Sequence, residues 1–137
     1  MVNDRESNTS GCLYLCATPI GNLEDITYRA VRILGEVDLI AAEDTRTSRK
    51  LLDRYEINTP VTSYHEHNKL EKADVLIDKL EQGMNIAVIT DAGTPGISDP
   101  GEELALKCYE EGIEVFSIPG PAAFVSAVIS SGRSCRR

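Results

Sequence analysis

The stretch that decides the fold is Asn85–Gly101, NIAVITDAGTPGISDPG. Its first six residues, NIAVIT, form a short apolar run that predicts a buried strand. Its end, with Glu102, has the form of a capping box with proline at the first helical position, which predicts a helix beginning near Asp99. The loop between them is longer than a simple connection requires. The stretch therefore predicts a strand and a helix joined by a loop that binds a ligand.

The same alternation of strand and helix runs through the rest of the chain. Further strands are predicted at Cys12–Ala17, Asp38–Ala42, Val61–Tyr64 and Glu114–Ile118. Further helices are predicted from an N-cap at Asp25 to a stop at Gly35, over Thr45–Tyr55, over Leu70–Leu80 with a stop at Gly83, and from Pro121 onward. Strands separated by helices indicate a mostly parallel sheet. We therefore predict an α/β fold, Rossmann-like, with a five-stranded, mostly parallel sheet flanked by helices.

In such a sheet, every loop from a strand to a helix emerges at the carboxyl edge, where ligands bind. These loops contain most of the polar, glycine-rich and proline-rich sequence; they are residues 18–22, 43–46, 65–68, 91–96 and 119–121. The loops at the opposite edge resemble plain solvated turns. The asymmetry predicts that one edge of the sheet carries the chemistry.

The loop at Asp91–Gly96 has the composition of a ligand loop. Gly93 and Gly96 allow close backbone approach and positive φ angles, and Pro95 stiffens the loop. An acid directly after a strand, here Asp91, can accept hydrogen bonds from ribose hydroxyls or an amine. Asp99, further on, is expected only to cap the next helix. The chain contains no GxGxxG and no GxxxxGK[ST], which disfavours dinucleotide binding and P-loop phosphoryl transfer.

Charged residues follow the second predicted strand. Glu43 and Asp44 precede a helix, so one of them is expected to cap it, and at least one to have a functional role. Arg46 and Arg49 lie in the first turns of that helix, where cations do not suit the helix dipole. This placement indicates an anionic partner such as phosphate, although a solvated basic face, shared with Lys50 and Arg54, is the alternative.

His65 directly follows the third predicted strand, so it is a candidate base or hydrogen-bond donor. An exposed histidine at a helix entrance is the other interpretation. No metal site is expected: the four cysteines contain no CxxC pair and lie far in sequence from the two histidines. Cys12, Cys16, Cys108 and Cys135 are instead predicted to be reduced thiols.

The length and composition limit what the chain can be. Its 137 residues, 42% of them hydrophobic, suit one domain with a real core. A net charge of −8 means that any RNA contact must come from a local basic patch or from chain outside these 137 residues. No run approaches the ~20 apolar residues of a membrane span, and the polar N-terminus does not resemble a secretory signal. We expect no membrane partner, a cytoplasmic location, and a flexible lead-in over residues 1–10.

Five segments together resemble the tetrapyrrole-methylase superfamily, and within it the branch that methylates small-subunit ribosomal RNA. They are Leu15–Leu23, Ala42–Arg46, Ser63–Asn68, Thr90–Gly101 and Pro119–Ala123. The resemblance runs from about Leu13 to Gly132. It implies a two-domain enzyme, a homodimer in its full-length form, that transfers a methyl group from S-adenosyl-L-methionine to the 2′-hydroxyl of a cytidine in 16S ribosomal RNA.

The resemblance also implies roles for individual residues. The residues expected to border S-adenosyl-L-methionine are Pro19, Asp91, Ala92, Gly93, Thr94, Pro95, Ile97, Ser98, Pro119, Gly120 and Pro121. Asn22, Arg46 and Arg49 are expected to face the RNA. The general base stays open among Glu43, Asp44 and His65.

The chain departs from the family's pattern at its end. Family members continue through a second domain, whereas here a basic tail, residues 133–137 (RSCRR), follows the predicted domain at 11–132. We expect this tail to be aberrant or truncated and the second domain to be absent, which puts activity in doubt. Two alternatives stay open: a methyltransferase acting on a tetrapyrrole or other small molecule, and an inactive, truncated fragment that binds a partner.

Overall fold

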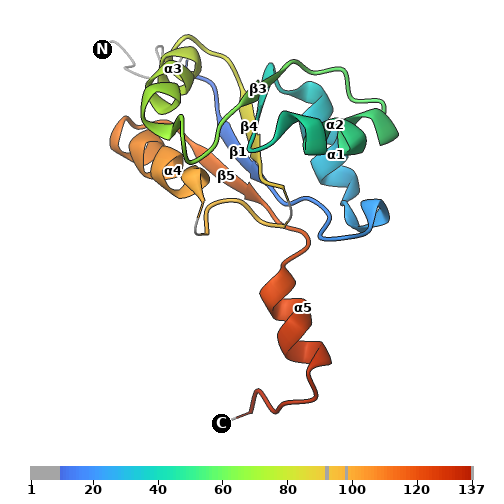
Figure 1. Ribbon diagram of the computed structural model, residues 1–137. Coiled ribbons are helices and arrows are strands. Elements are labelled where there is room, and N and C mark those ends of the chain that lie inside the picture. Colours follow the sequence, from blue (N-terminus) through green and yellow to red (C-terminus); the bar gives the residue numbers. More distant parts are fainter. Residues whose placement is uncertain (1–9, 92, 98, 137) are drawn as a thin grey trace, which may run out of the picture.

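A five-stranded parallel sheet forms the centre of the molecule (Figure 1). The computed structural model describes residues 10–91, 93–97 and 99–136, so the predicted lead-in lies, Ser10 apart, outside this range. The strands are β1 (Leu13–Cys16), β2 (Leu39–Ala42), β3 (Val61–Ser63), β4 (Ile86–Ile89) and β5 (Val115–Ile118), in the order β3-β2-β4-β1-β5. Every neighbouring pair is parallel, which confirms the predicted fold class.

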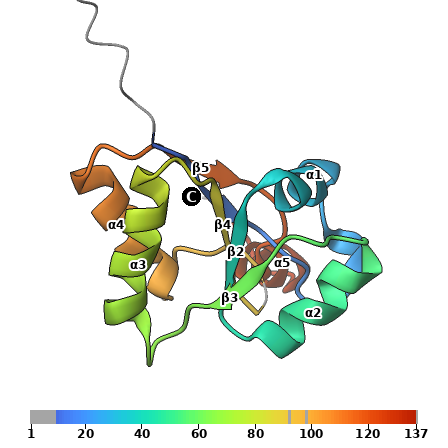
Figure 2. The ribbon, with the colours of Figure 1, turned by 90° about the horizontal axis from the view of Figure 1, so that it is seen from above.

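Helices cover both faces of the sheet. The helical elements are η1 (Leu23–Asp25, one 3₁₀ turn), α1 (Tyr28–Glu36), α2 (Thr45–Arg54), α3 (Lys69–Glu81), α4 (Pro100–Glu110) and α5 (Ala123–Ser130). Figure 2 shows α3 and α4 on one face and α1 and α2 on the other. No helix in the described part of the chain is long and apolar enough to span a membrane.

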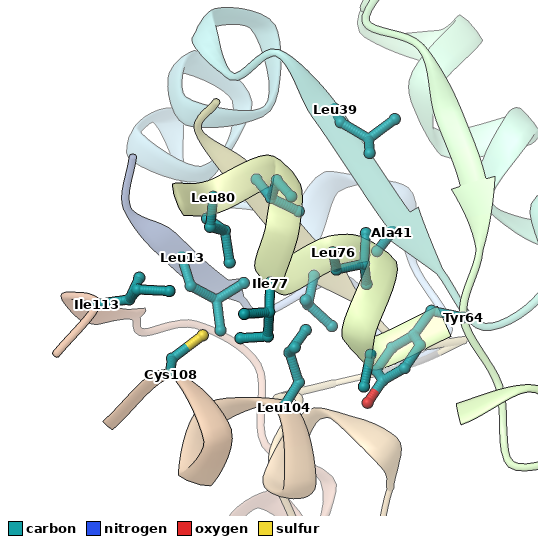
Figure 3. Close-up of a cluster of buried hydrophobic side chains, with 13 residues drawn as sticks. Leu13, Leu39, Ala41, Tyr64, Leu76, Ile77, Leu80, Leu104, Cys108 and Ile113 are labelled. Atoms are coloured by element: carbon teal, nitrogen blue, oxygen red, sulfur yellow. The ribbon is translucent and has the colours of Figure 1, made fainter. Parts of the chain in front are cut away.

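The core has two layers because side chains along a strand alternate between the faces of the sheet. Leu13 of β1 and Ile86 of β4 pack with Leu76 of α3 and with the other members of the cluster in Figure 3. The next residues along the same strands, Tyr14 and Ala87, turn to the second cluster with α1 and α2. Apolar runs buried on both faces are typical of parallel strands, which explains why the central strands β1, β2 and β4 read as continuous apolar segments.

Three predicted helix boundaries are wrong. Asp25 does not cap α1, because it lies in η1; the cap is Thr27, whose hydroxyl accepts a hydrogen bond from the Ala30 N–H at 3.0 Å. Gly35 lies inside α1, which continues to Glu36. The last helix begins at Ala123, since Pro121 stays in the preceding loop, where its carbonyl accepts a hydrogen bond from the Thr94 hydroxyl.

The last helix stands apart from the layered domain. Figure 1 shows α5 extending away from the carboxyl edge of the sheet, beyond the loop that follows β5. None of its residues is buried, although its sequence, AFVSAVIS, is largely apolar. The fold therefore leaves an apolar helix in solvent next to the edge predicted to carry the chemistry.

Candidate active site

Loops from three adjacent strands meet at the carboxyl edge. Thr18, after β1, and Gly93, after β4, exchange backbone hydrogen bonds of 2.9 and 3.0 Å. The Thr94 hydroxyl donates to the Pro121 carbonyl, after β5, at 3.0 Å. The structure thus brings together the three loops in which the cofactor-binding residues were predicted. Of these residues, Ala92 and Ser98 lie outside the described range.

Backbone conformation explains one of the glycines in this surface, and close packing explains another. Gly93 has φ +86°, and a Cβ there would lie 3.4 Å from Ile20 Cγ2. A Cβ at Gly120 would lie only 2.9 Å from the Ala17 Cβ, which is tighter than real packing allows. A side chain at Gly120 would push the loops after β5 and β1 apart, whereas at Gly93 it is the positive φ that disfavours a side chain. The glycines therefore keep these loops in one continuous surface.

Asp99 shapes the second half of the loop after β4. Its carboxylate accepts hydrogen bonds from the N–H groups of Gly96 (2.9 Å), Ile97 (3.2 Å) and Gly101 (2.8 Å). The bond from Gly101 caps α4, which confirms the role predicted for Asp99. The bonds from Gly96 and Ile97 were not foreseen; they fold the loop back onto the helix that follows it.

The two acids after β2 have different positions. Asp44 caps α2, accepting hydrogen bonds from the N–H groups of Arg46 (2.8 Å) and Thr47 (3.4 Å). These bonds stabilise the charged form and, with the bond from Arg46 as the largest cause, lower the pKa of Asp44. Glu43 Oε2 instead accepts a hydrogen bond from the Asp91 N–H at 3.4 Å. Of the two acids, Glu43 is the one in contact with the loop after β4.

His65 lies on the other side of the edge. It follows β3, which is an outer strand separated from β4 by β2. The Asn68 side-chain oxygen accepts the His65 N–H at 2.8 Å, and His65 Nδ1 accepts the His67 N–H at 3.2 Å. One ring nitrogen is thus used to order the turn. His65 shares the edge with the predicted cofactor loops but belongs to the half built from β2 and β3.

The residues predicted to face RNA are all exposed. The Arg46 side chain is 95% exposed, with its Nε 3.9 Å from Asp44 Oδ1. Arg49 lies one turn further along α2, while Leu51 and Leu52 fill the buried face of that helix, as its pattern predicts. Asn22 caps η1 by accepting the Glu24 N–H at 3.0 Å. A basic, solvent-facing helix surface therefore lies beside the predicted cofactor loops.

A pocket of about 210 Å³ lies between these two parts of the edge. It is lined by Thr18, Pro19, Leu23, Thr47, Ser48, Lys50, Leu51, Ile89, Thr90 and Asp91. Sequence reasoning assigned Pro19 and Asp91 to the site, placed Lys50 only on a basic helix face, and gave no role to Leu23, Thr47 or Ser48. Their types are ordinary for helix surfaces, and only the packing of α2 against the loop after β1 makes them walls of a pocket.

Metal-binding side chains are not clustered in the part of the chain that the structure describes: no group of three His, Cys, Asp or Glu residues could hold an ion. All four cysteines are free thiols. Burial raises the pKa of Cys16 and of Cys108 to about 12, so both are protonated at neutral pH. These two cysteines act as small core side chains.

A parallel sheet with glycine- and proline-rich loops at one carboxyl edge is typical of α/β domains, in which ligands bind at that edge. The family model of the tetrapyrrole (corrin/porphyrin) methylases matches residues 12–136, and the chain belongs to this family. The resemblance found in the five sequence segments is thereby confirmed.

Curated relatives lie close in sequence. The chain is 58% identical over 127 residues to a ribosomal RNA small subunit methyltransferase I of Synechocystis sp., covering 93% of this chain and 46% of the relative. It is 55% identical over 128 residues to the protein of the same name from Halalkalibacterium halodurans, covering 93% and 44%. The chain thus spans a little under half the length of the curated relatives it matches.

Solved structures share the fold at low sequence identity. A uroporphyrin-III-C-methyltransferase from Thermus thermophilus superposes with a TM-score of 0.69 at 21% identity, covering 93% of this chain and 55% of that one. A cobalt precorrin-4 methyltransferase gives a TM-score of 0.67 at 22% identity, covering 88% and 51%. In both cases the chain corresponds to about half of the larger structure.

Proposed function

We propose that this chain forms the first domain, residues 11–132, of a methyltransferase that transfers a methyl group from S-adenosyl-L-methionine to small-subunit ribosomal RNA, at the 2′-hydroxyl of a cytidine. The observation that carries the proposal is the joining of the loops after β4, β1 and β5 into one surface beside the basic helix α2. The names of relatives at 58% and 55% identity support the RNA substrate.

The donor set of the edge suits this cofactor. Asp91 is exposed at the end of β4, where a carboxylate can accept hydrogen bonds from a ribose hydroxyl or from the amino group of the methionine part. Beside it, Gly93 takes a positive φ, and Gly120 lets the loops after β5 and β1 pack closely. We assign the cofactor surface to Pro19, Asp91, Ala92, Gly93, Thr94, Pro95, Ile97, Ser98, Pro119, Gly120 and Pro121.

The chain's residues would act mainly by alignment. S-adenosyl-L-methionine supplies a methyl group that is already activated, so the protein's main task is to hold the ribose hydroxyl in line with it. Arg46 and Arg49, with Asn22, would position the RNA through its backbone. A general base that removes the hydroxyl proton adds about 10²–10⁴-fold. Among Glu43, Asp44 and His65 we favour Glu43, because it contacts the Asp91 backbone.

The alternatives make different predictions. A methyltransferase for a tetrapyrrole or another small molecule would not bind RNA with the strong salt dependence that the basic helix α2 predicts for an RNA-methylating protein. A fragment that only binds a partner would keep the fold without binding the cofactor. An RNA-methylating protein of this kind would be cytoplasmic, and we propose a homodimer for the full-length form.

The test of the proposed function measures cofactor and RNA separately. Calorimetry of the 137-residue chain with S-adenosyl-L-homocysteine tests the loop surface, and filter binding of a small-subunit RNA fragment at several salt concentrations tests α2. A version extended by the second half found in the relatives should incorporate labelled methyl into a cytidine ribose. Methyl incorporation into a base, or into a tetrapyrrole but not RNA, would overturn the proposal.

A further inference from the structure

The pocket beside α2 occupies the boundary between the two functional halves of the edge. Loops from β4, β1 and β5 form the proposed cofactor surface, whereas α2 follows β2 and carries the proposed RNA contacts. The pocket takes walls from both halves: Pro19 and Asp91 from the loops, and Thr47, Lys50 and Leu51 from α2. A group bound there would lie where methyl donor and acceptor must meet.

The size of the pocket limits its occupant. Its volume of about 210 Å³ is several times the ~30 Å³ share of one water molecule. It is smaller than the ~300–1,000 Å³ typical of pockets that enclose a drug-sized ligand. The whole cofactor therefore does not fit, but a single small ring does. Among nucleobases, the one-ring pyrimidines suit this space better than the two-ring purines.

The walls have the chemistry of a nucleobase site. Pro19, Leu23, Leu51 and Ile89 supply apolar surface for the faces of a ring. Two lining hydroxyls are engaged within the protein, since Ser48 donates to the Asp44 carbonyl at 2.5 Å and Thr18 to the Thr90 carbonyl at 3.4 Å. Lys50 has three donors and, among the residues the structure describes, no carboxylate within salt-bridge distance.

We propose that this pocket receives one pyrimidine base turned out of its RNA strand, with Lys50 donating a hydrogen bond to the base's carbonyl oxygen. Enzymes that modify a base extrude its nucleotide in this way and recognise the base in a fitted pocket, and here the same recognition would fix the attached ribose. The ribose attached to that base would then lie between α2 and the loop after β4. The inference rests on the proposed function and adds the substrate subsite to it.

Amide NMR of the ¹⁵N-labelled 137-residue chain tests the proposal, with cytidine 5′-monophosphate as the probe. Its addition should shift the amide signals of Thr47, Ser48 and Lys50 in a saturable way, and adenosine 5′-monophosphate should bind at least tenfold more weakly. S-adenosyl-L-homocysteine should instead shift Gly93 and Thr94.

Two variants and a control separate the pocket from general charge effects. Leu23→Trp fills the pocket from a half-exposed position and should weaken cytidine 5′-monophosphate at least tenfold while leaving S-adenosyl-L-homocysteine unchanged. Lys50→Met should weaken the binding of cytidine 5′-monophosphate about tenfold. Arg54→Met removes the same charge four residues further along α2, from a side chain that does not line the pocket, and should change binding less than twofold.

Each outcome has one meaning. Cytidine shifts outside the pocket, no cytidine binding, or undiminished binding by Leu23→Trp would overturn the pocket proposal while the cofactor surface stands. If adenosine 5′-monophosphate bound the pocket as tightly as cytidine 5′-monophosphate, and S-adenosyl-L-homocysteine displaced it, the pocket would belong to the cofactor. That result would also overturn the pocket proposal. Cytidine binding in the pocket without any S-adenosyl-L-homocysteine binding would support the subsite and count against the proposed function.

Discussion

Asp91 is the residue on which the cofactor assignment depends most directly. Its carboxylate stands exposed at the end of β4, and a hydrogen bond to such a charged group contributes about 1.5–3 kcal/mol. We expect Asp91→Ala to weaken S-adenosyl-L-methionine binding at least about tenfold in calorimetry. The loop backbone survives the change, so binding should weaken without being abolished. Asp78→Ala, on the exposed side of α3, is the matched control, and equal affinity of the two variants would remove Asp91 from the site.

Arg46 has a separate role in this scheme. Its side chain is 95% exposed and only loosely paired with Asp44, so it is available to a phosphate. Arg46→Ala should lower RNA binding and reduce the slope of log affinity against log salt by about one. Cofactor affinity should hardly change, because α2 lies outside the loop surface. If filter binding gives the same slope as the parent chain, the basic face of α2 is only solvated surface.

For single residues, the sequence predicts a role that depends on near neighbours in the chain, but it does not predict a role that depends on tertiary packing. The pattern around Asp99 predicts its cap correctly, because capping depends on residues within one turn. Thr47 and Lys50 line a pocket only because α2 packs beside the loop after β1. No local signal distinguishes them from ordinary helix surface, so that part of the site could not be predicted.

Among the elements, α2 depends on its cap for its position at the edge. Asp44 accepts two backbone N–H groups of the first turn, and its pKa is lowered in the folded state. A carboxyl group with a lowered folded pKa contributes stability that is present above its unfolded value, near 3.8, and lost as the pH falls through the folded value. Asp44→Ala should therefore lower Tm at pH 7, and the difference should shrink below pH 4.

The control for this prediction lies on the same helix. Asp53→Ala removes an acid near the carboxyl end of α2, where a negative charge opposes the helix dipole, so Tm should stay level or rise slightly. Asp44→Asn should keep most of the cap, because asparagine also accepts the N–H groups. An Asp44→Ala variant with an unchanged Tm at pH 7 would contradict a stabilising cap.

The helices and strands themselves were largely predictable, and the errors lie at their ends. The central strands β1, β2 and β4 read as apolar runs because both faces of the sheet are covered there, whereas the edge strands β3 and β5 include polar or exposed residues. The start of α1 was misplaced because Asp25 and Thr27 are both acceptable caps, and a 3₁₀ turn at Leu23–Asp25 occupies the first of them. That turn is held by tertiary contact as well, since the Tyr55 hydroxyl donates to the Leu23 carbonyl at 2.5 Å.

For the whole molecule, the fold class follows from the alternation of elements, but the strand order does not. Alternation requires a parallel sheet, whereas the order β3-β2-β4-β1-β5 is set by which faces pack together. The proposed function depends on that order, because it places the loops after β4, β1 and β5 side by side and puts α2 next to them. Residues that lie far apart in the sequence thus form two adjoining surfaces, the loop surface and the basic face of α2, only in the folded chain.

The exposed helix α5 leads to a prediction about the chain as a whole. Phe124 is 66% exposed and Ile129 74% exposed, and Val125 and Val128 extend the same apolar surface. Contiguous apolar surface of this kind drives association. We expect the 137-residue chain to unfold in a cooperative thermal transition, since its sheet and core are intact, and to self-associate with rising concentration in sedimentation velocity. It should incorporate no labelled methyl into small-subunit RNA, because the relatives are about twice as long.

Variants of α5 test whether this helix causes the self-association. Phe124→Ser with Ile129→Ser should shift the chain towards monomer without lowering Tm, because neither side chain is packed against the domain. Tyr109→Ser on α4 removes an aromatic ring that is 82% exposed, and it should leave the association unchanged. If the double variant associates as strongly as the parent, another surface must be responsible. Methyl transfer by the unextended chain would mean that this one domain holds a complete active site, and the two-domain scheme would have to be abandoned.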